Sequence, residues 1–427
     1  MRVTWRVSLL VLGVAVMFGG AVAAADEEER PSEFTDDGKY DPAGMLLTWQ
    51  QDPLTTMTID WNTYEDRETA VQYRQAGDWE FSEATGETHA FPFSERTIHR
   101  VELTGLEPGT RYEFRLGDDS VTYAFRTMPE NIVDQPVRFA AGGDTRHNQE
   151  WMENTNAQAA RFDVDFVTWG GDLAYADGRE DRLYRWEEWF EAMKQLVTED
   201  GRVIPVLAGI GNHEVVNGYY YNHDDYEQTD EWRADIAPYF FALFAFPGQP
   251  GYGAMDFGDY LSIVLLDSDH ANPIEGEQTE WLEQALQERQ DVPHVFPNYH
   301  VPAYPSHRSY DGGVQTRVRE QWVPLFDEYG VRVAFENHDH TYKRTHPIRG
   351  GEIAKDGIVY LGDGAWGVGT RSGDSQDEWY MNKFASVRHA IIATIHGPHQ
   401  HFLVISEDGD IVDEYPETSF REIYGLE

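Results

Sequence analysis

The pattern of hydrophobic and polar residues changes once along the chain, near residue 130. Between residues 45 and 127, apolar and polar residues alternate over short runs, as at 56–61 and 111–116. Alternation is typical of strands that bury one face, and Pro-Gly and Gly-Asp turn signals separate the runs. Several short strands at this spacing predict a β-sandwich, here over residues 41–129.

After a Pro-flanked hinge at 129–136, short apolar strands alternate with longer helical patterns over residues 137–427. We expect strands at 137–141, 165–169, 203–207, 262–266, 331–335 and 358–361, and helices at 183–197, 277–288 and 315–329. Alternation of strands and helices predicts an α/β domain. In such domains the chemistry lies at the carboxyl ends of the strands.

The first 25 residues have the pattern of a secretory signal peptide. Arg2 and Arg6 precede an apolar stretch at 7–18, and small residues at 19–25 allow cleavage near Ala23 or Ala25. The alternative is an uncleaved anchor, because residues 7–25 approach the roughly 20 residues that span a bilayer. We predict a signal peptide at 1–25, an acidic linker at 26–40, and a secreted or periplasmic protein that leaves the membrane after cleavage.

The composition excludes several classes of function. The net charge is -43, from 33 basic and 76 acidic residues, so the surface repels nucleic acid and anionic membranes. There is no cysteine, which excludes disulfides, thiolate zinc sites and thiol catalysis. Only five residues are Lys. An acidic, Lys-poor surface leads to the hypothesis of a salty medium, in which self-repulsion is screened.

Five strands of the second domain run into loops that contain metal-ligand residue types. In chain order these loops offer Asp144, Asp172 with Tyr175, Asn212 with His213, His300, and His338 with His340. Each loop alone also fits a structural role, because Gly-Asp pairs are common turns and single histidines are often structural. All five follow predicted strands, with His300 coming after the apolar residues 295–296. Together they predict a metal centre at one edge of the domain.

The order of the motifs identifies a family. Gly-Asp, Gly-Asp-x-x-Tyr, Gly-Asn-His-Glu, one His before Val-Pro, and His-x-His together resemble the metallophosphoesterase superfamily. The Tyr of the second motif is similar to purple acid phosphatases. The resemblance implies a fibronectin type III-like β-sandwich followed by a four-layer αββα catalytic domain. It also implies a small phosphorylated substrate, a phosphate monoester, which a metal-bound hydroxide attacks.

The same resemblance implies how the ligands divide between two metal ions. One ion, Fe(III), would be held by Asp144, Tyr175 and His340. A divalent ion, Zn, Fe or Mn, would be held by Asn212, His300 and His338, and Asp172 would bridge the two. The chemistry agrees, because ferric iron favours carboxylate and phenolate oxygen, whereas imidazole suits divalent ions.

Further residues are expected beside the metals. By resemblance His213 protonates the leaving group, with Glu214 orienting its imidazole, unless His213 is only a structural neighbour of the ligands. His307 either faces the substrate or is simply exposed. Arg146 either contacts the phosphate or pairs with one of the many carboxylates.

The sequence departs from the family at residue 337, where Asn replaces the usual Gly. We expect Asn337 to adopt the left-handed conformation that Gly would provide. Without cysteine, a disulfide-linked dimer is excluded. Two alternatives stay open: a phosphodiesterase or nucleotidase on the same core, and a non-catalytic secreted metal-binding or adhesion protein. A calcium-binding surface protein is disfavoured, because the acidic residues form no calcium-loop motif.

Overall fold

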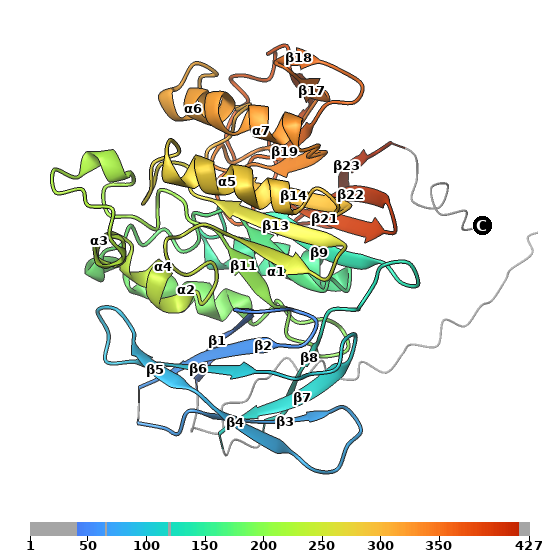
Figure 1. Cartoon of the computed structure of the whole chain (residues 1–427). Coiled ribbons are helices and arrows are strands. Elements are labelled where there is room, and N and C mark those ends of the chain that lie inside the picture. The colour runs from blue at the N-terminus through green and yellow to red at the C-terminus, as the bar shows by residue number, and fades with distance from the viewer. Residues whose placement is uncertain (1–40, 65, 118–120, 418–427) are drawn as a thin grey trace, which may run out of the picture.

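The computed structural model of the chain describes residues 41–64, 66–117 and 121–417. Figure 1 shows a β-sandwich, drawn in blue, beneath a larger domain of helices and strands. The predicted signal peptide and acidic linker lie outside the described residues. Within those residues, no helix is both long and apolar enough to cross a membrane.

The N-terminal domain consists of two four-stranded antiparallel sheets, which confirms the predicted β-sandwich. The first sheet has the order β1 (Asp41–Thr48), β2 (Met57–Thr63), β6 (Thr97–Leu103) and β5 (Glu87–Ala90). The second has the order β4 (Ser82–Thr85), β3 (Ala70–Gln75), β7 (Arg111–Leu116) and β8 (Tyr123–Arg126). In β7 the apolar residues Tyr112, Phe114 and Leu116 are buried and the residues between them are not, as the alternation predicts.

Two mixed sheets form the centre of the second domain. The six-stranded sheet has the order β11 (Val206–Ala208), β10 (Phe166–Trp169), β9 (Val137–Gly142), β21 (His389–His396), β22 (His399–Ser406) and β23 (Ile411–Tyr415). The seven-stranded sheet has the order β12 (Gly253–Phe257), β13 (Leu261–Leu266), β14 (His294–Tyr299), β15 (Val333–Phe335), β19 (Val359–Gly362), β16 (Tyr342–Thr345) and β20 (Met381–Ala385). A separate small pair joins β17 (Ile348–Arg349) to β18 (Glu352–Ile353).

The sheets pack face to face, and helices cover their outer faces (Figure 1). Phe139 of β9 lies between the sheets, with its ring centroid 5.6 Å from that of Phe296 on β14. Its neighbour Ala140 points the other way, into the cluster under α1 (Gln149–Arg161) and α2 (Tyr184–Met193). On the other sheet, Val264 packs under α5 (Glu277–Glu288), α6 (Gly313–Gln321) and α7 (Val323–Glu328). The four-layer αββα arrangement is confirmed, and each buried Phe stabilises it by roughly 1.5–3 kcal/mol.

The predicted helix at 277–288 has the same bounds as α5. The single helix expected at 315–329 is instead two, because Pro324 lacks an N–H and begins a new helix in the first turn of α7. The loop between β11 and β12 contains two helices that the pattern did not predict, α3 (Asp230–Ile236) and α4 (Pro238–Leu243). Short 3₁₀ helices lie at Glu180–Arg182 and Tyr220–Asn222.

The sandwich and the second domain share one apolar core. Trp49 at the end of β1 packs edge-on against Phe166 and Phe257, with ring centroids 6.0 and 5.5 Å away. The Tyr260 hydroxyl donates to the carbonyl of Pro129, at 2.9 Å. The first sheet of the sandwich therefore supports the underside of the catalytic domain.

Candidate metal centre and active site

Both central sheets deliver side chains to one site. Strands β9, β10 and β11 are parallel neighbours in the six-stranded sheet, and β14 and β15 are parallel neighbours in the seven-stranded sheet. Parallel neighbours end at the same edge of a sheet. The loops that follow these five strands contain all seven predicted ligands. Hydrogen-bond distances connect them into one cluster, in which all members except Asn212 are buried.

The first group of side chains combines a carboxylate, a phenol and an imidazole. The Tyr175 hydroxyl donates to Oδ1 of Asp144 at 2.9 Å and lies 3.1 Å from Nε2 of His340. Nε2 of His340 lies 3.0 Å from Oδ1 of Asp144. All three residues are buried. Three potential ligand atoms from three loops therefore meet around one point.

The second group combines two imidazoles and an amide oxygen. Nε2 of His300 lies 3.2 Å from Oδ1 of Asn212 and 2.9 Å from Nδ1 of His338. His300 and His338 are buried, so their nitrogens have little access to bulk water. Burial and the charge of Arg308 hold the pKa of His338 well below its ordinary value, which keeps the imidazole in the neutral form that binds metals.

Asp172 belongs to both groups. Its carboxylate clusters with His300 and His338 on one side and with Asp144 and His340 on the other, with all ligand atoms of each cluster within 4.8 Å of one another. Burial alone would raise the pKa of Asp172. The imidazoles of His300 and His213 outweigh that effect and lower the pKa well below its usual range. A shared, ionised carboxylate is the residue that a two-metal site requires as a bridge.

The imidazole tautomers also fit metal binding. Nδ1 of His300 lies 3.2 Å from the carbonyl oxygen of Gly170, and Nδ1 of His340 lies 3.3 Å from that of Gly369. A carbonyl only accepts, so each Nδ1 carries a hydrogen and Nε2 is the ring nitrogen that faces the cluster. Such a hydrogen bond to the far ring nitrogen is typical of metal-binding histidines.

The backbone is strained at the same residues. Five of the seven predicted ligands have positive φ between 54° and 79°, namely Asp144, Asp172, Tyr175, His338 and His340. This left-handed conformation costs roughly 1–2 kcal/mol for a residue with a Cβ. Strain of this kind persists where the surroundings impose it and is concentrated at functional sites. The backbone of these loops therefore keeps an unfavourable conformation that directs the ligand side chains toward the cluster.

Tyr175 is a neutral phenol in the absence of a cation. Burial, together with the charges of Asp144 and Asp172, raises its pKa well above the ordinary value. Ligation as phenolate therefore depends on a cation strong enough to reverse this shift. The hydrogen bond to Asp144 already places the phenol oxygen where such a cation would bind.

His213 lies at the opening of the site and is about one-third exposed (36%). Its Nε2 is 3.9 Å from Oδ2 of Asp172, and its Nδ1 is 2.5 Å from Oδ1 of Asp177. The prediction that Glu214 orients this imidazole is wrong. Glu214 is buried, and its carboxylate accepts the backbone N–H groups of Gly211, Asp172 and Leu173 at 2.7–2.8 Å.

Asp177 is the partner of His213 that the sequence did not single out. It ends the same Gly-Asp loop that supplies Asp172 and Tyr175, so the loop itself was the available signal. A carboxylate at Nδ1 fixes the ring orientation of His213 and leaves Nε2 directed toward the cluster. Glu214 instead ties the loops of β10 and β11 together.

Two further predicted residues lie outside the cluster. Arg146 forms an ion pair with Glu188, which is the second of its two expected roles. Nδ1 of His307 lies 2.6 Å from the carbonyl of Ser372 and 3.5 Å from Oδ2 of Asp374, and the ring is partly exposed. In the described part of the chain His307 has no hydrogen bond to any of the seven predicted ligands.

Asn337 does not adopt the predicted left-handed conformation, because the positive φ falls on His338 and His340 instead. Its side-chain amide donates to the carbonyl of Tyr299 at 2.8 Å. The amide fills space that the glycines of the neighbouring loops leave free, since a Cβ on Gly143 would lie 2.5 Å from Oδ1 of Asn337. Asn337 therefore acts through its side chain, as a wedge between strand ends.

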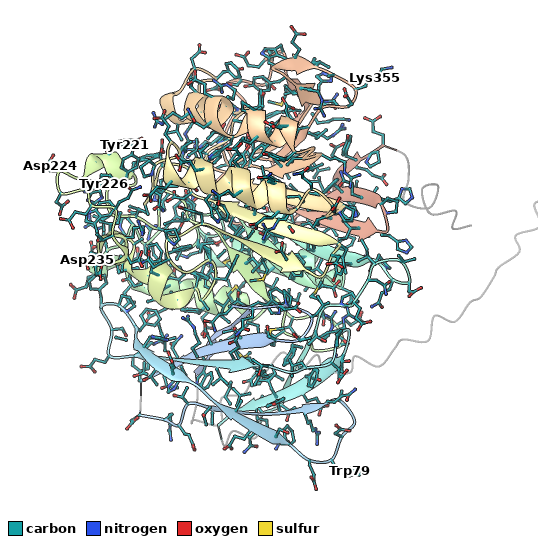
Figure 2. All side chains as sticks on the ribbon, in the orientation of Figure 1. Trp79, Tyr221, Asp224, Tyr226, Asp235 and Lys355 are labelled. Atoms are coloured by element: carbon teal, nitrogen blue, oxygen red, sulfur yellow. The ribbon has the colours of Figure 1, made fainter. Side chains whose placement is uncertain are left out.

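A cleft of about 750 Å³ opens beside His338. Three consecutive tyrosines, Tyr219 to Tyr221, form one wall, and Arg308 and Arg317 also line the cleft. The rings of Tyr219 and Tyr221 are stacked, with centroids 5.1 Å apart. Tyr221 lies at the margin of the molecule in Figure 2. The cleft thus joins the candidate metal centre to an aromatic surface.

Comparison with known families supports both domains. Residues 42–127 match the family model described as purple acid phosphatase, N-terminal domain, and residues 137–342 match the model described as calcineurin-like phosphoesterase.

Individual proteins agree with the family models. Probable purple acid phosphatase 20 of Arabidopsis thaliana is 26% identical over 373 residues, covering 83% of this chain and 82% of that protein. An uncharacterised protein of Mycobacterium tuberculosis is 24% identical over 386 residues, covering 80% of this chain and 69% of its own. The solved structure of a purple acid phosphatase from yellow lupin seeds has a TM-score of 0.72 at 18% identity, covering 87% of this chain and 73% of that one, and so shares the fold.

Proposed function

Because this chain belongs to the purple acid phosphatases, which are metal-dependent phosphate-ester hydrolases, we propose that it is a secreted phosphomonoesterase with a two-metal centre. The observation that supports the proposal best is the double role of Asp172, which lies in two overlapping clusters of potential ligands. One cluster would hold Fe(III) and the other a divalent ion, Zn, Fe or Mn. The donor sets follow that division, since only the first contains a phenol.

Two bound metal ions would polarise the phosphate, acidify a water and neutralise charge in the transition state. The residues that would hold the first ion are Asp144, Tyr175 and His340, with Asn212, His300 and His338 for the second. Asp172 would be shared. All of them except Asn212 are buried, which limits the access of competing water to the ligand atoms. The strained backbone of five of them fixes the positions of their side chains before substrate arrives, which lowers the reorganisation that catalysis requires.

His213 is suited to protonate the leaving oxygen of the ester. It is partly exposed at the opening of the site, and Asp177 orients its ring through Nδ1. With Nδ1 held by this carboxylate, Nε2 is the ring nitrogen that faces the leaving oxygen. Glu214 contributes indirectly, by holding the backbone of Asp172 in place.

The cleft beside His338 is the space for the alcohol part of the substrate. It is large enough for an organic leaving group, and its tyrosine wall offers an apolar surface with hydroxyl groups. The phosphodiesterase or nucleotidase alternative would use the same cleft and the same ligands. Activity on a monoester and on a diester separates the two functions.

The first experiment measures hydrolysis of 4-nitrophenyl phosphate by protein lacking residues 1–25, before and after removal of metals. We expect turnover that disappears on chelation and returns with iron plus a divalent ion. Turnover on bis(4-nitrophenyl) phosphate alone would favour the diesterase. No turnover on either ester by protein that contains two metals would contradict the proposed function. Secretion rests on the pattern of residues 1–25 and is tested by N-terminal mass determination of exported protein.

A further inference from the structure

Arg371 is a half-buried arginine beside the metal centre. Its Nη1 donates to the carbonyl oxygen of His338 at 3.3 Å, and its backbone N–H donates to that of His340 at 3.1 Å. Among the described residues no carboxylate forms an ion pair with it, although acidic residues outnumber basic ones by 76 to 33 in the chain. Arginines withdrawn from water are mostly paired. A half-buried guanidinium that has no carboxylate partner and lies beside the metal centre is therefore a candidate for binding an anion.

Arg308 lies next to Arg371 and provides a comparison. Its Nη1 donates to the same carbonyl of His338 and to Oδ1 of Asp339, both at 2.6 Å. Arg308 is paired directly with the buried Asp339. Both arginines are anchored at a carbonyl of the metal centre, but among the described residues only Arg308 has a carboxylate at ion-pair distance.

Arg371 also has a defined position relative to the metal centre. Its side chain and its backbone are held at the carbonyls of His338 and His340, one residue from each of the two ligand clusters. Arg308, which donates to the same carbonyl of His338, lines the cleft together with His338. A phosphoryl group over the metal centre, with its alcohol part in the cleft, would lie within reach of this guanidinium.

We propose that Arg371 binds the phosphoryl group of the substrate and that its unneutralised charge selects the dianion of a monoester over the monoanion of a diester. This inference rests on the proposed function of the site. A guanidinium presents several N–H donors in one plane, which match two phosphate oxygens. Its attraction to a dianion is strengthened where water is scarce. Asp339 keeps Arg308 out of this role by neutralising it.

The test uses the metal-loaded full-length protein at pH 7, where a phosphate monoester is mostly dianionic because its second pKa is about 6. The variants are Arg371→Gln and Arg371→Lys. The matched control is Arg161→Gln, an exposed arginine at the end of α1 whose Nη1 donates to the side chain of Gln158. For each, kcat/KM is measured on 4-nitrophenyl phosphate and bis(4-nitrophenyl) phosphate. Binding of inorganic phosphate is measured by calorimetry, and metal content by elemental analysis.

We expect Arg371→Gln to lower kcat/KM for the monoester by about 10- to 100-fold, as for loss of a charge-assisted hydrogen bond. Phosphate affinity should fall by a similar factor, and the diester rate by less than about threefold. Arg371→Lys keeps the charge but not the planar fork, so it should retain most of the monoester preference with weaker phosphate binding. Arg161→Gln should match the wild type.

Equal losses on both esters, or unchanged phosphate affinity in Arg371→Gln with two metals bound, would overturn the proposal. If Arg371→Gln lost metals, phosphate binding by metal-loaded Arg371→Lys would decide, and wild-type affinity there would overturn the proposal. If the wild type cleaved neither ester, the proposed function would fail. The phosphate titration would then still report on Arg371 alone.

Discussion

The two central sheets contribute different chemistry to one site. The six-stranded sheet supplies mainly oxygen ligands, from Asp144, Asp172, Tyr175 and Asn212, whereas the seven-stranded sheet supplies only imidazoles, from His300, His338 and His340. Each cluster of potential ligands draws on both sheets. Neither sheet could build either metal position alone, so the metals would join the two layers as well as perform chemistry.

Asp172→Asn should have the largest effect, because Asp172 is the member that both clusters share. The amide keeps the size of the side chain but removes the charge that compensates two cations. We expect loss of both metals and a fall in kcat of at least about 10⁴-fold. Metal analysis and turnover check this. Retention of two metals by this variant would show that the clusters are independent.

Variants of single histidines should affect one of the two ligand clusters at a time. His340→Ala removes a ligand of the first cluster, and His338→Ala removes one of the second. Each should reduce the metal content from two ions to one and lower kcat by about 10³-fold. The retained ion should differ between the variants, iron in His338→Ala and the divalent ion in His340→Ala. The same retained ion in both would contradict the assigned division.

His213→Gln should lower kcat by roughly 10²-fold or more with both metals retained, because it removes the proton donor and no ligand. The loss should shrink with an activated ester such as 4-nitrophenyl phosphate relative to an alkyl phosphate, since a good leaving group needs less protonation. Metal loss would instead assign His213 a structural role.

Asp177→Asn should act in the same direction as His213→Gln but less, by about tenfold, because it affects only the orientation of the His213 ring. The dependence of kcat on the leaving group distinguishes this from general damage. We expect the loss to shrink with 4-nitrophenyl phosphate relative to an alkyl phosphate, as for His213→Gln. An equal loss on both esters would leave Asp177 without influence on His213.

The smallest effect concerns a contact between the sheets that lies apart from the ligands. His389 of β21 packs edge-on against Tyr342 of β16, with ring centroids 5.2 Å apart. Burial lowers the pKa of His389 to about 4. Between pH 6.5 and 4 the unfolded chain therefore binds a proton that the folded chain does not, and stability falls as the pH falls. This should amount to about 1.6 kcal/mol from pH 6.5 to pH 5.

His389→Gln should remove that part of the acid sensitivity, because the amide can still donate to the carbonyl of Val387 without taking up a proton. Urea unfolding of metal-free wild type and variant at pH 6.5 and pH 5 measures the difference. Identical pH dependence in the two proteins would show that His389 is not the group responsible.

The periodicity of apolar residues predicted the strands and helices that bury one face along their length. Strand β7 and helix α5 appear with their predicted bounds because each has one buried face. The hairpin of β21 and β22 was not predicted. It pairs with β9, more than two hundred residues earlier in the chain, and local pattern carries no information about such a partner.

In the site, too, the sequence pattern predicted some residues and not the contacts between distant ones. Ligand types after strands, at Asp144 or His300, can be read from the sequence because the strand ends fix where they meet. The partner of His213 could not be assigned that way. Asp177 and Glu214 are both acidic and near the site, and only the backbone path decides which of them reaches the imidazole. Arg371 comes from a distant loop and has no motif of its own.

Because of the Asn337 side chain, the effect of a substitution at Gly143 depends on which residue occupies position 337. Gly143→Ala alone would push a methyl group against the Asn337 side chain, whose atoms are its three nearest neighbours. After Asn337→Gly, the same methyl group would enter the space that the amide has left. Gly143→Ala is therefore tolerated after Asn337→Gly but not before it. As long as Asn337 is present, position 143 therefore has to stay Gly.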